Sequence, residues 1–142
     1  MERRFLITGG AGFIGSSVIR RCLNNKHNFV INVDCLTYAG NSESLAEFVD
    51  SERYTHAVVN ICDRREIGKI LKIHRPTCIM HLAAETHVDR SIEGPSDFIN
   101  TNITGTFNLL EAARYHYDTL DKAQKEQFRF HHISTDEVYG DL

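Results

Sequence analysis

A glycine-rich segment near the N-terminus constrains the fold more than any other feature of the chain. Gly9, Gly12 and Gly15 follow an apolar run at residues 5–7 and open an amphipathic stretch that begins at Ile14. A strand that passes through glycines into a helix brings backbone N–H groups and the positive end of the helix dipole together, which favours a pyrophosphate. The first interval is one residue wider than in the usual dinucleotide fingerprint. The segment predicts a dinucleotide site, and the alternative is a tight turn without a ligand.

The next acidic residue stands where a dinucleotide site needs one. Asp34 ends a second apolar run at residues 29–33, about 20 positions after the glycines. A carboxylate there can accept hydrogen bonds from the adenosine ribose and would repel a 2′-phosphate, while the neighbouring Cys35 is neutral where an NADP site often has arginine. The pair favours NAD over NADP. The alternative is an aspartate that only ends a strand at a turn.

Composition limits the remaining possibilities. The chain has 142 residues, 42% hydrophobic and 25% charged, which fits one domain over residues 1–142. Its formal charge is −3 and its Lys and Arg are scattered, so neither a nucleic acid nor an anionic membrane is expected as a partner. The sequence has no apolar run of the length expected for a signal peptide or a membrane-spanning helix. This pattern is typical of a cytoplasmic protein. The four cysteines form no C-x-x-C pair, so reduced thiols are expected rather than a metal site: Cys22, Cys35, Cys62 and Cys78.

Alternating strand-like and helix-like segments predict an α/β fold with a doubly wound parallel sheet. Strands are expected at 3–8, 29–34, 56–61, 77–82 and 128–134, and helices at 13–25, 42–49, 64–74, 96–116 and 119–126. Asp63 fits the N-cap of the third helix. The fourth helix has an apolar residue at every helical turn, so that face is expected to pack on the sheet: Phe98, Ile99, Ile103, Phe107, Leu110 and Ala113.

Two polar segments follow predicted strands, at the edge where open α/β sheets bind ligands. In residues 82–90, the small Ala83 and Ala84 would let a cofactor lie close to the backbone, and Thr86, His87 and Arg90 offer polar groups to a substrate. The alternative is a polar loop in which Asp89 pairs with Arg90 in solvent.

The second segment, residues 130–140, contains the adjacent acids Asp136 and Glu137. Adjacent side chains on a strand point to opposite faces, so their joint action requires the backbone to turn just after Ser134. The alternative is that Ser134 and Glu137 form a helix capping box. The neighbouring His131 and His132 lack a further ligand at metal-binding spacing and are expected to be packing and edge residues.

Five segments taken together closely resemble the dTDP-glucose 4,6-dehydratase family of extended short-chain dehydrogenase/reductases, which have a Rossmann-like fold. They are residues 9–16, 34–41, 82–91, 101–106 and 134–140. The resemblance covers essentially the whole chain but only the N-terminal part of the family's longer chains, so the later strands and the substrate domain are expected to be absent. The Thr135-Asp136-Glu137 sequence replaces a serine-rich segment of related epimerases and favours a 4,6-dehydratase.

The resemblance implies a lyase reaction: NAD⁺ oxidises dTDP-glucose at C4, water leaves across C5 and C6, and the hydride returns to C6. Thr135, Asp136 and Glu137 would be catalytic, with Glu137 taking the C5 proton and Asp136 protonating the C6 hydroxyl. Thr86 and Thr135 would reach the sugar. The residues implied to bind NAD are Gly9, Gly12, Phe13, Ile14, Gly15, Asp34, Cys35, Leu36, Thr37, Asn60, Ile61, Leu82, Ala83, Ala84, Glu85, Thr86 and Thr101.

Three departures qualify that expectation. The family often has Lys at Cys35 and Asp at Asn60, and its Tyr-x-x-x-Lys pair is missing from these 142 residues. The chain alone is therefore expected to be inactive. The alternatives are a dehydratase acting on UDP- or CDP-glucose and a non-catalytic NAD-binding or assembly module. A fifth strand left at the sheet edge also predicts a homodimer or higher self-association.

Overall fold

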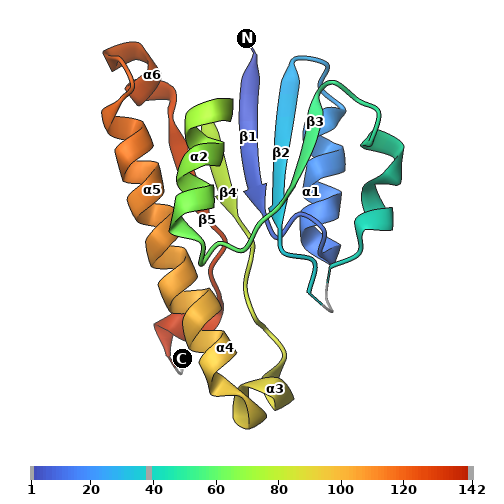
Figure 1. Cartoon of the computed structure of the whole chain (residues 1–142), viewed down its shortest axis with the longest axis vertical. Helices are drawn as coiled ribbons and strands as arrows, with labels where there is room; N and C mark the ends of the chain where they lie inside the picture. The colour runs from blue at the N-terminus through green and yellow to red at the C-terminus, as the bar shows by residue number, and fades with distance from the viewer. Residues whose placement is uncertain (1, 38–39, 141–142) are drawn as a thin grey trace.

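The predicted parallel sheet is confirmed in the computed structural model, which describes residues 2–37 and 40–140 (Figure 1). Five parallel strands stand in the order β3-β2-β1-β4-β5, with β1 in the centre. They are β1 (Arg3–Thr8), β2 (Asn28–Asp34), β3 (Tyr54–Val58), β4 (Cys78–His81) and β5 (Arg129–His132). Tyr38 and Ala39, part of the segment at 34–41 that carries the family resemblance, lie outside the described residues.

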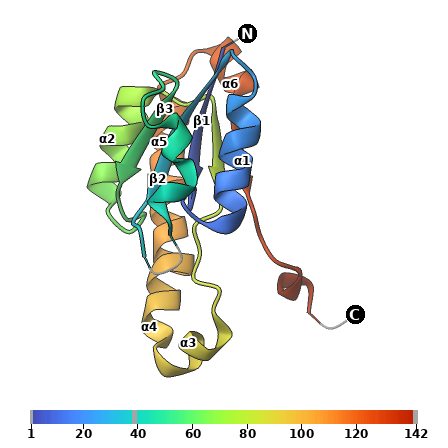
Figure 2. The ribbon, with the colours of Figure 1, turned by 90° about the vertical axis from the view of Figure 1, so that its right-hand side faces the viewer.

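Helices cover both faces of the sheet, so the central strands are apolar on both sides. Figure 2 shows the strands between α1 (Phe13–Leu23) on one side and α2 (Arg64–His74) on the other. One core joins Ile7 of β1 to Ile19 of α1, and the second joins Leu6 of β1 to Ile67 of α2. The remaining helical elements are η1 (Ser42–Phe48), α3 (Val88–Glu93), α4 (Pro95–Phe98), η2 (Ile99–Gly105), α5 (Thr106–Asp118), α6 (Lys122–Gln127) and η3 (Asp136–Tyr139).

Several element bounds differ from those expected. The third strand begins at Tyr54 and ends at Val58, whereas the apolar pattern placed it at 56–61. The segment expected as a helix at 42–49 is a 3₁₀-helix with a kink at Leu45, and α3 lies where no helix was predicted. The cap assigned to Asp63 is confirmed, since its Oδ1 accepts the N–H groups of Arg65 and Glu66, each at 3.1 Å.

The expected packing face of the helix at 96–116 is wrong except at Ala113, which is buried. This segment is α4, a π-helical stretch η2 and α5 in succession, and its buried residues are Gly105, Leu109, Ala112, Ala113 and His116. The small residues let α5 pack closely against α2. The wider π turn changes the angular phase of the helix, and α4 with η2 extends past the end of the sheet (Figure 1). An apolar stripe is left 46–60% exposed: Ile99, Ile103, Phe107 and Leu110.

All four cysteines are free thiols, as expected. Among the helices of residues 2–37 and 40–140, none is both long and apolar enough to cross a membrane.

Candidate functional site

The predicted site segments gather at one edge of the sheet. All strands are parallel, so the glycine turn, the end of β2 and the loop after β4 lie together at their carboxyl ends, the lower side of Figure 1. Open α/β sheets bind ligands at this edge.

Packing explains two of the three spaced glycines but not the third. A Cβ on Gly9, whose φ is +69°, would lie 2.7 Å from the Ala83 nitrogen, and a Cβ on Gly15 would lie 2.1 Å from the Gly9 oxygen. Gly12 has an ordinary φ of −76°, and its Cβ would meet only the Gly9 oxygen, at 3.3 Å. A tight turn therefore requires Gly9 and Gly15, whereas the bare backbone at Gly12 leaves an open cradle. That cradle fits a pyrophosphate.

The start of α1 is also open. Phe13 is 90% exposed and Ile14 62% exposed, and no described side chain caps the helix at Gly12. The first-turn N–H groups of a helix have no partners within it, so an uncapped helix start is available to an anion. Ile14 thus lies outside the apolar face of α1, which Ile19 and Leu23 form.

Gly10 was not among the predicted site residues, although the structure leaves no room for a side chain there. Its Cβ would lie 2.2 Å from Oδ1 of Asn32, a fully buried residue of β2. The Asn32 Nδ2 donates to the Tyr54 hydroxyl at 3.0 Å, which fixes the amide beneath the glycine turn. The paired glycines at 9 and 10 were the only sequence signal for this contact.

The Asp34 carboxylate holds two turns together. Its Oδ2 accepts from the Ala11 N–H and its Oδ1 accepts from the Leu36 N–H, both at 2.9 Å. This is the turn role weighed as the alternative, and each oxygen keeps a second lone pair for a ribose hydroxyl. Burial, followed by the Asp34 charge, raises the pKa of the Cys35 thiol, so Cys35 is neutral at pH 7. Thr37 is exposed beside them.

Two residues in the segment that follows β3 differ in exposure. Asn60 is exposed, and its Oδ1 accepts from the Cys62 N–H at 2.8 Å, so this oxygen is engaged in a local turn. Ile61 is 4% exposed and packs in the core against Gly105. The side chain of Ile61 is therefore not accessible to a cofactor.

The loop after β4 is fastened to η2 by a side chain that the sequence pattern did not single out. The Glu85 N–H donates to Oδ1 of Asn102 at 2.8 Å, and Nδ2 of Asn102 donates to the Glu85 oxygen at 2.9 Å. The loop's side chains range from half-buried at Leu82, Ala83 and Glu85 to exposed at Ala84, Thr86 and His87, and Thr101 of η2 is half-buried. The side chains of Val88 and Arg90 lie outside the described parts, so the predicted donor at Arg90 is not placed.

A buried histidine, also absent from the predicted site, joins three elements behind this loop. The Nδ1 of His81 lies 2.7 Å from the Thr8 hydroxyl of β1, and its Nε2 lies 2.9 Å from the Thr106 hydroxyl of α5. Burial, with a smaller contribution from His132, lowers the pKa of His81 to about 4. His81 is therefore neutral at pH 7.

The acid pair lies on a segment of its own. The 3₁₀ turn η3 begins at Asp136, so the backbone turns after Ser134 as joint action of the acids requires. Thr135 and Asp136 are exposed, and the side chain of Glu137 is outside the described parts. Figure 2 shows this segment leaving the sheet beyond β5, at the same end as the glycine turn but apart from α3 and α4.

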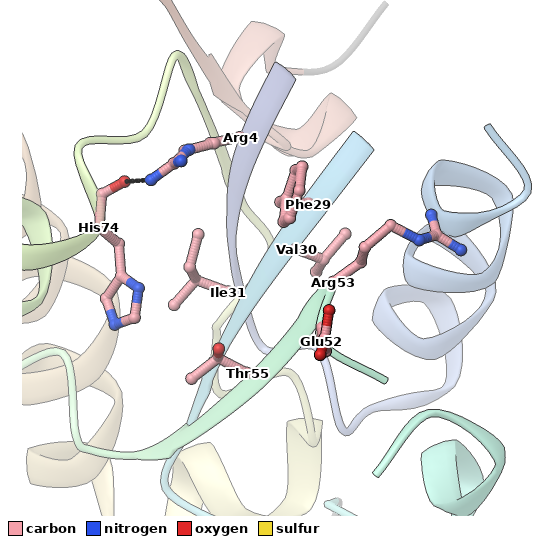
Figure 3. Close-up of a pocket in the computed structure, with 8 residues that line it drawn as sticks. All are labelled: Arg4, Phe29, Val30, Ile31, Glu52, Arg53, Thr55 and His74. Carbon is pink, nitrogen blue, oxygen red and sulfur yellow. Dashed lines mark hydrogen bonds between the residues drawn. The ribbon is translucent and has the colours of Figure 1, made fainter. Parts of the chain in front are cut away.

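A cavity of about 240 Å³ lies at the opposite, amino ends of β1 and β2 (Figure 3). Its cations serve the chain's own backbone: Arg4 donates to the His74 oxygen, and Arg53 donates to three carbonyl oxygens around the start of β2. Its lining residues are Arg4, Phe29, Val30, Ile31, Glu52, Arg53, Thr55 and His74. Within the described ranges no cluster of His, Cys, Asp and Glu is arranged to hold a metal, and His131 and His132 are exposed.

Comparison with known proteins gives a consistent set of relatives. The family model described as GDP-mannose 4,6 dehydratase matches residues 6–142. The chain is 60% identical over 139 residues to dTDP-glucose 4,6-dehydratase 1 of Escherichia coli K12, and 59% identical over 140 residues to the dTDP-glucose 4,6-dehydratase of Neisseria meningitidis. These alignments cover 98% and 99% of this chain but 38% and 39% of the relatives, so the chain spans about two fifths of their length.

Solved structures of dehydratases and epimerases are also similar to this chain. The dTDP-glucose 4,6-dehydratase DesIV of Streptomyces venezuelae, solved with NAD bound, superposes with a TM-score of 0.81 at 41% identity, over 98% of this chain and 41% of that one. A UDP-glucose 4-epimerase of Thermus thermophilus in complex with NAD gives a TM-score of 0.70 at 33% identity, over 80% of this chain and 34% of that one.

Proposed function

Because the chain belongs to the GDP-mannose 4,6 dehydratase family, we propose that it is the NAD-binding part of a 4,6-dehydratase that acts on dTDP-glucose. The proposal that the chain binds NAD rests on the open cradle at Gly12, where packing does not require glycine and α1 begins without a side-chain cap. The proposal that the substrate is dTDP-glucose rests on the 60% identity to the Escherichia coli dTDP-glucose 4,6-dehydratase.

In this proposal, separate groups of residues bind the cofactor, hold the sugar and transfer protons. The N-terminus of α1 binds the pyrophosphate, and the remaining lone pairs of Asp34 accept from the adenosine ribose. When bound, NAD⁺ would accept the hydride from C4 of the sugar and return it to C6 after water has left. The new C4 ketone acidifies the C5 proton, which Glu137 removes while Asp136 protonates the departing C6 hydroxyl. Thr86 and Thr135 hold the sugar hydroxyls.

Two alternatives remain open to experiment: a dehydratase for UDP- or CDP-glucose, and a module that binds NAD without turnover. The test is a chimera in which this chain replaces the matching region of the Escherichia coli enzyme, assayed by mass spectrometry on dTDP-, UDP- and CDP-glucose. Loss of water from dTDP-glucose above the other two supports the proposal. Preference for another nucleotide, or no product from a folded chimera that binds NAD, favours the corresponding alternative.

The chain is expected to bind NAD more tightly than NADP, by about tenfold, because the Asp34 carboxylate repels a 2′-phosphate and the neutral Cys35 offers no compensating cation. Titration calorimetry with the 142-residue chain measures both affinities. Asp34→Asn should reduce the ratio of the two affinities, because it removes the charge that repels the 2′-phosphate of NADP. Equal or tighter binding of NADP by the unmodified chain would contradict the role given to Asp34.

We also propose that a second copy of the chain covers the apolar stripe of Ile99, Ile103, Phe107 and Leu110. These residues are 46–60% exposed on one side of η2 and α5, and large adjoining apolar residues on a protein surface mark an interaction site. Light scattering should show more than a monomer, and Phe107→Glu should shift the population towards monomer. Val49→Glu, at an exposed valine outside the stripe, is the matched control. A monodisperse monomer at high concentration would rule this out.

A further inference from the structure

The buried side chain of His81 lies between two threonine hydroxyls, and the hydrogen bonds around it determine which ring nitrogen carries the proton. The Thr8 Oγ1 accepts from the N–H groups of Leu82 and Ala83, each at 3.2 Å, and the Leu82 N–H is shared with the Thr8 backbone oxygen, also at 3.2 Å. Those two donors occupy both lone pairs of the hydroxyl oxygen. The only hydrogen that Thr8 can place toward His81 is its own O–H, so Nδ1 of His81, 2.7 Å away, must accept.

The other side of the ring follows from the first. A neutral imidazole that accepts at Nδ1 carries its hydrogen on Nε2, which therefore donates to the Thr106 hydroxyl at 2.9 Å. Three elements are linked in one direction: the backbone after β4 donates to Thr8 of β1, Thr8 donates to His81, and His81 donates to Thr106 of α5. A second proton on the ring would place two hydrogens between Thr8 and Nδ1, and the chain of donors would break.

We propose that His81 is a positioning residue: as the neutral Nε2–H tautomer it orients the Thr8 hydroxyl, and Thr8 fixes the Leu82–Ala83 backbone that forms one wall of the cofactor site. The link to that site is steric as well as polar. A Cβ on Gly9 would lie 2.7 Å from the Ala83 nitrogen and 2.9 Å from the Leu82 carbonyl carbon, so the glycine turn rests directly on the peptide that Thr8 holds. The inference rests on the proposed function only for its effect on NAD.

The surroundings of His81 keep it in the required state. It is 1% exposed, and β1 and α5 present uncharged hydroxyls to it. From β5, Phe130 and His132 lie against the ring at centroid distances of 6.4 and 5.1 Å. His132 is the titratable group that acts on His81, and with burial it lowers the pKa of His81 to about 4.

The test begins without a ligand. Long-range ¹H–¹⁵N spectra of the 142-residue chain should show His81 as the Nε2–H tautomer, with a titration midpoint near 4, and the Leu82 and Ala83 amide signals should shift with that same midpoint. Thr8→Val removes the acceptor and the donor with little change of shape. It should speed hydrogen exchange at the Ala83 amide, whereas the Leu82 amide keeps its bond to the backbone oxygen of residue 8. It should also weaken NAD binding by about tenfold. His131→Gln, an exposed neighbour on β5, should leave both unchanged.

The possible outcomes separate the positioning role of His81 from the proposed binding of NAD. An Nδ1–H tautomer, or Leu82 and Ala83 amides that ignore the His81 titration, overturns the inference whether or not Thr8→Val folds. If Thr8→Val folds and keeps both a protected Ala83 amide and the NAD affinity, the inference is also wrong. If the unmodified chain shows the expected tautomer and coupled amides but no affinity for NAD, the positioning role stands and the proposed function fails.

Discussion

Gly15→Ala is expected to reduce the stability of the folded chain by about 3 kcal/mol or more, a large part of the roughly 5–15 kcal/mol that holds a domain of this size folded. The added Cβ would lie 2.1 Å from the Gly9 oxygen and 2.7 Å from the Gly10 Cα. Both are backbone atoms at the junction of β1 and α1, so neither can rotate away as a side chain would. Urea unfolding followed by circular dichroism measures the loss.

Two other glycines are matched controls. Gly68→Ala lies on the exposed side of α2, where a Cβ meets nothing within 4 Å, and should stabilise the chain by about 0.5–1 kcal/mol because glycine is a poor helix former. Gly12→Ala should cost about 1 kcal/mol or less, since its Cβ meets only the Gly9 oxygen at 3.3 Å. If Gly12→Ala instead destabilised the chain as much as Gly15→Ala, the cradle would be a packing feature and the cofactor argument would lose its main support.

The strand positions and the glycine turn follow from local sequence, which explains why most of them were predictable. Parallel strands covered on both faces have continuous apolar runs, and the runs before Gly9 and before Asp34 are both of this kind. The third strand was misplaced because β3 is an edge strand in which only Tyr54 is fully buried. Its apolar pattern is correspondingly weak, and Val59 and Ile61 beyond it extended the apparent run.

The face of α5 could not be read from the sequence because the helix has two apolar sides. Ile103 and Phe107 look like core residues by type, yet the residues that face α2 and the sheet include Gly105, Ala112 and Ala113. Close approach of two helices favours small side chains at the contact, so here Ile103 and Phe107 remain outside while Leu109 is buried with the alanines. A π-helical stretch has no reliable sequence signature, so its change of phase was also invisible.

The residues missing from the predicted site share one property: their partners lie far away in the sequence. His81 reaches Thr8 from 73 positions away, and Asn102 reaches the Glu85 backbone from 17. A histidine in a strand or an asparagine in a helix has many possible roles, and only the fold identifies its partner. Asp34 was found because its spacing from the glycines is local, but its bond to Ala11 was visible only in the structure.

Substitution of Asp136 or Glu137 is expected to have a large effect on catalysis by the chimera of this chain with the Escherichia coli enzyme. Glu137→Gln should lower turnover of dTDP-glucose by about 10²–10⁴-fold, the usual contribution of a general base. Oxidation at C4 does not need Glu137, so NADH should accumulate on the enzyme and be seen by its fluorescence. Asp136→Asn should slow the departure of water while C5 still exchanges its proton. Solvent deuterium should then enter C5 in Asp136→Asn and not in Glu137→Gln.

A capping role for Glu137 predicts the opposite result, because glutamine serves as well as glutamate at the third position of a capping box. Near-normal turnover by Glu137→Gln would therefore favour the structural role. Glu126→Gln is the matched control, since Glu126 is an exposed glutamate on α6, at the other end of the sheet from η3 (Figure 1). Accumulation of NADH distinguishes catalysis from capping, because an intact cap leaves every step at its normal rate, whereas a missing base stops the reaction after NADH has formed.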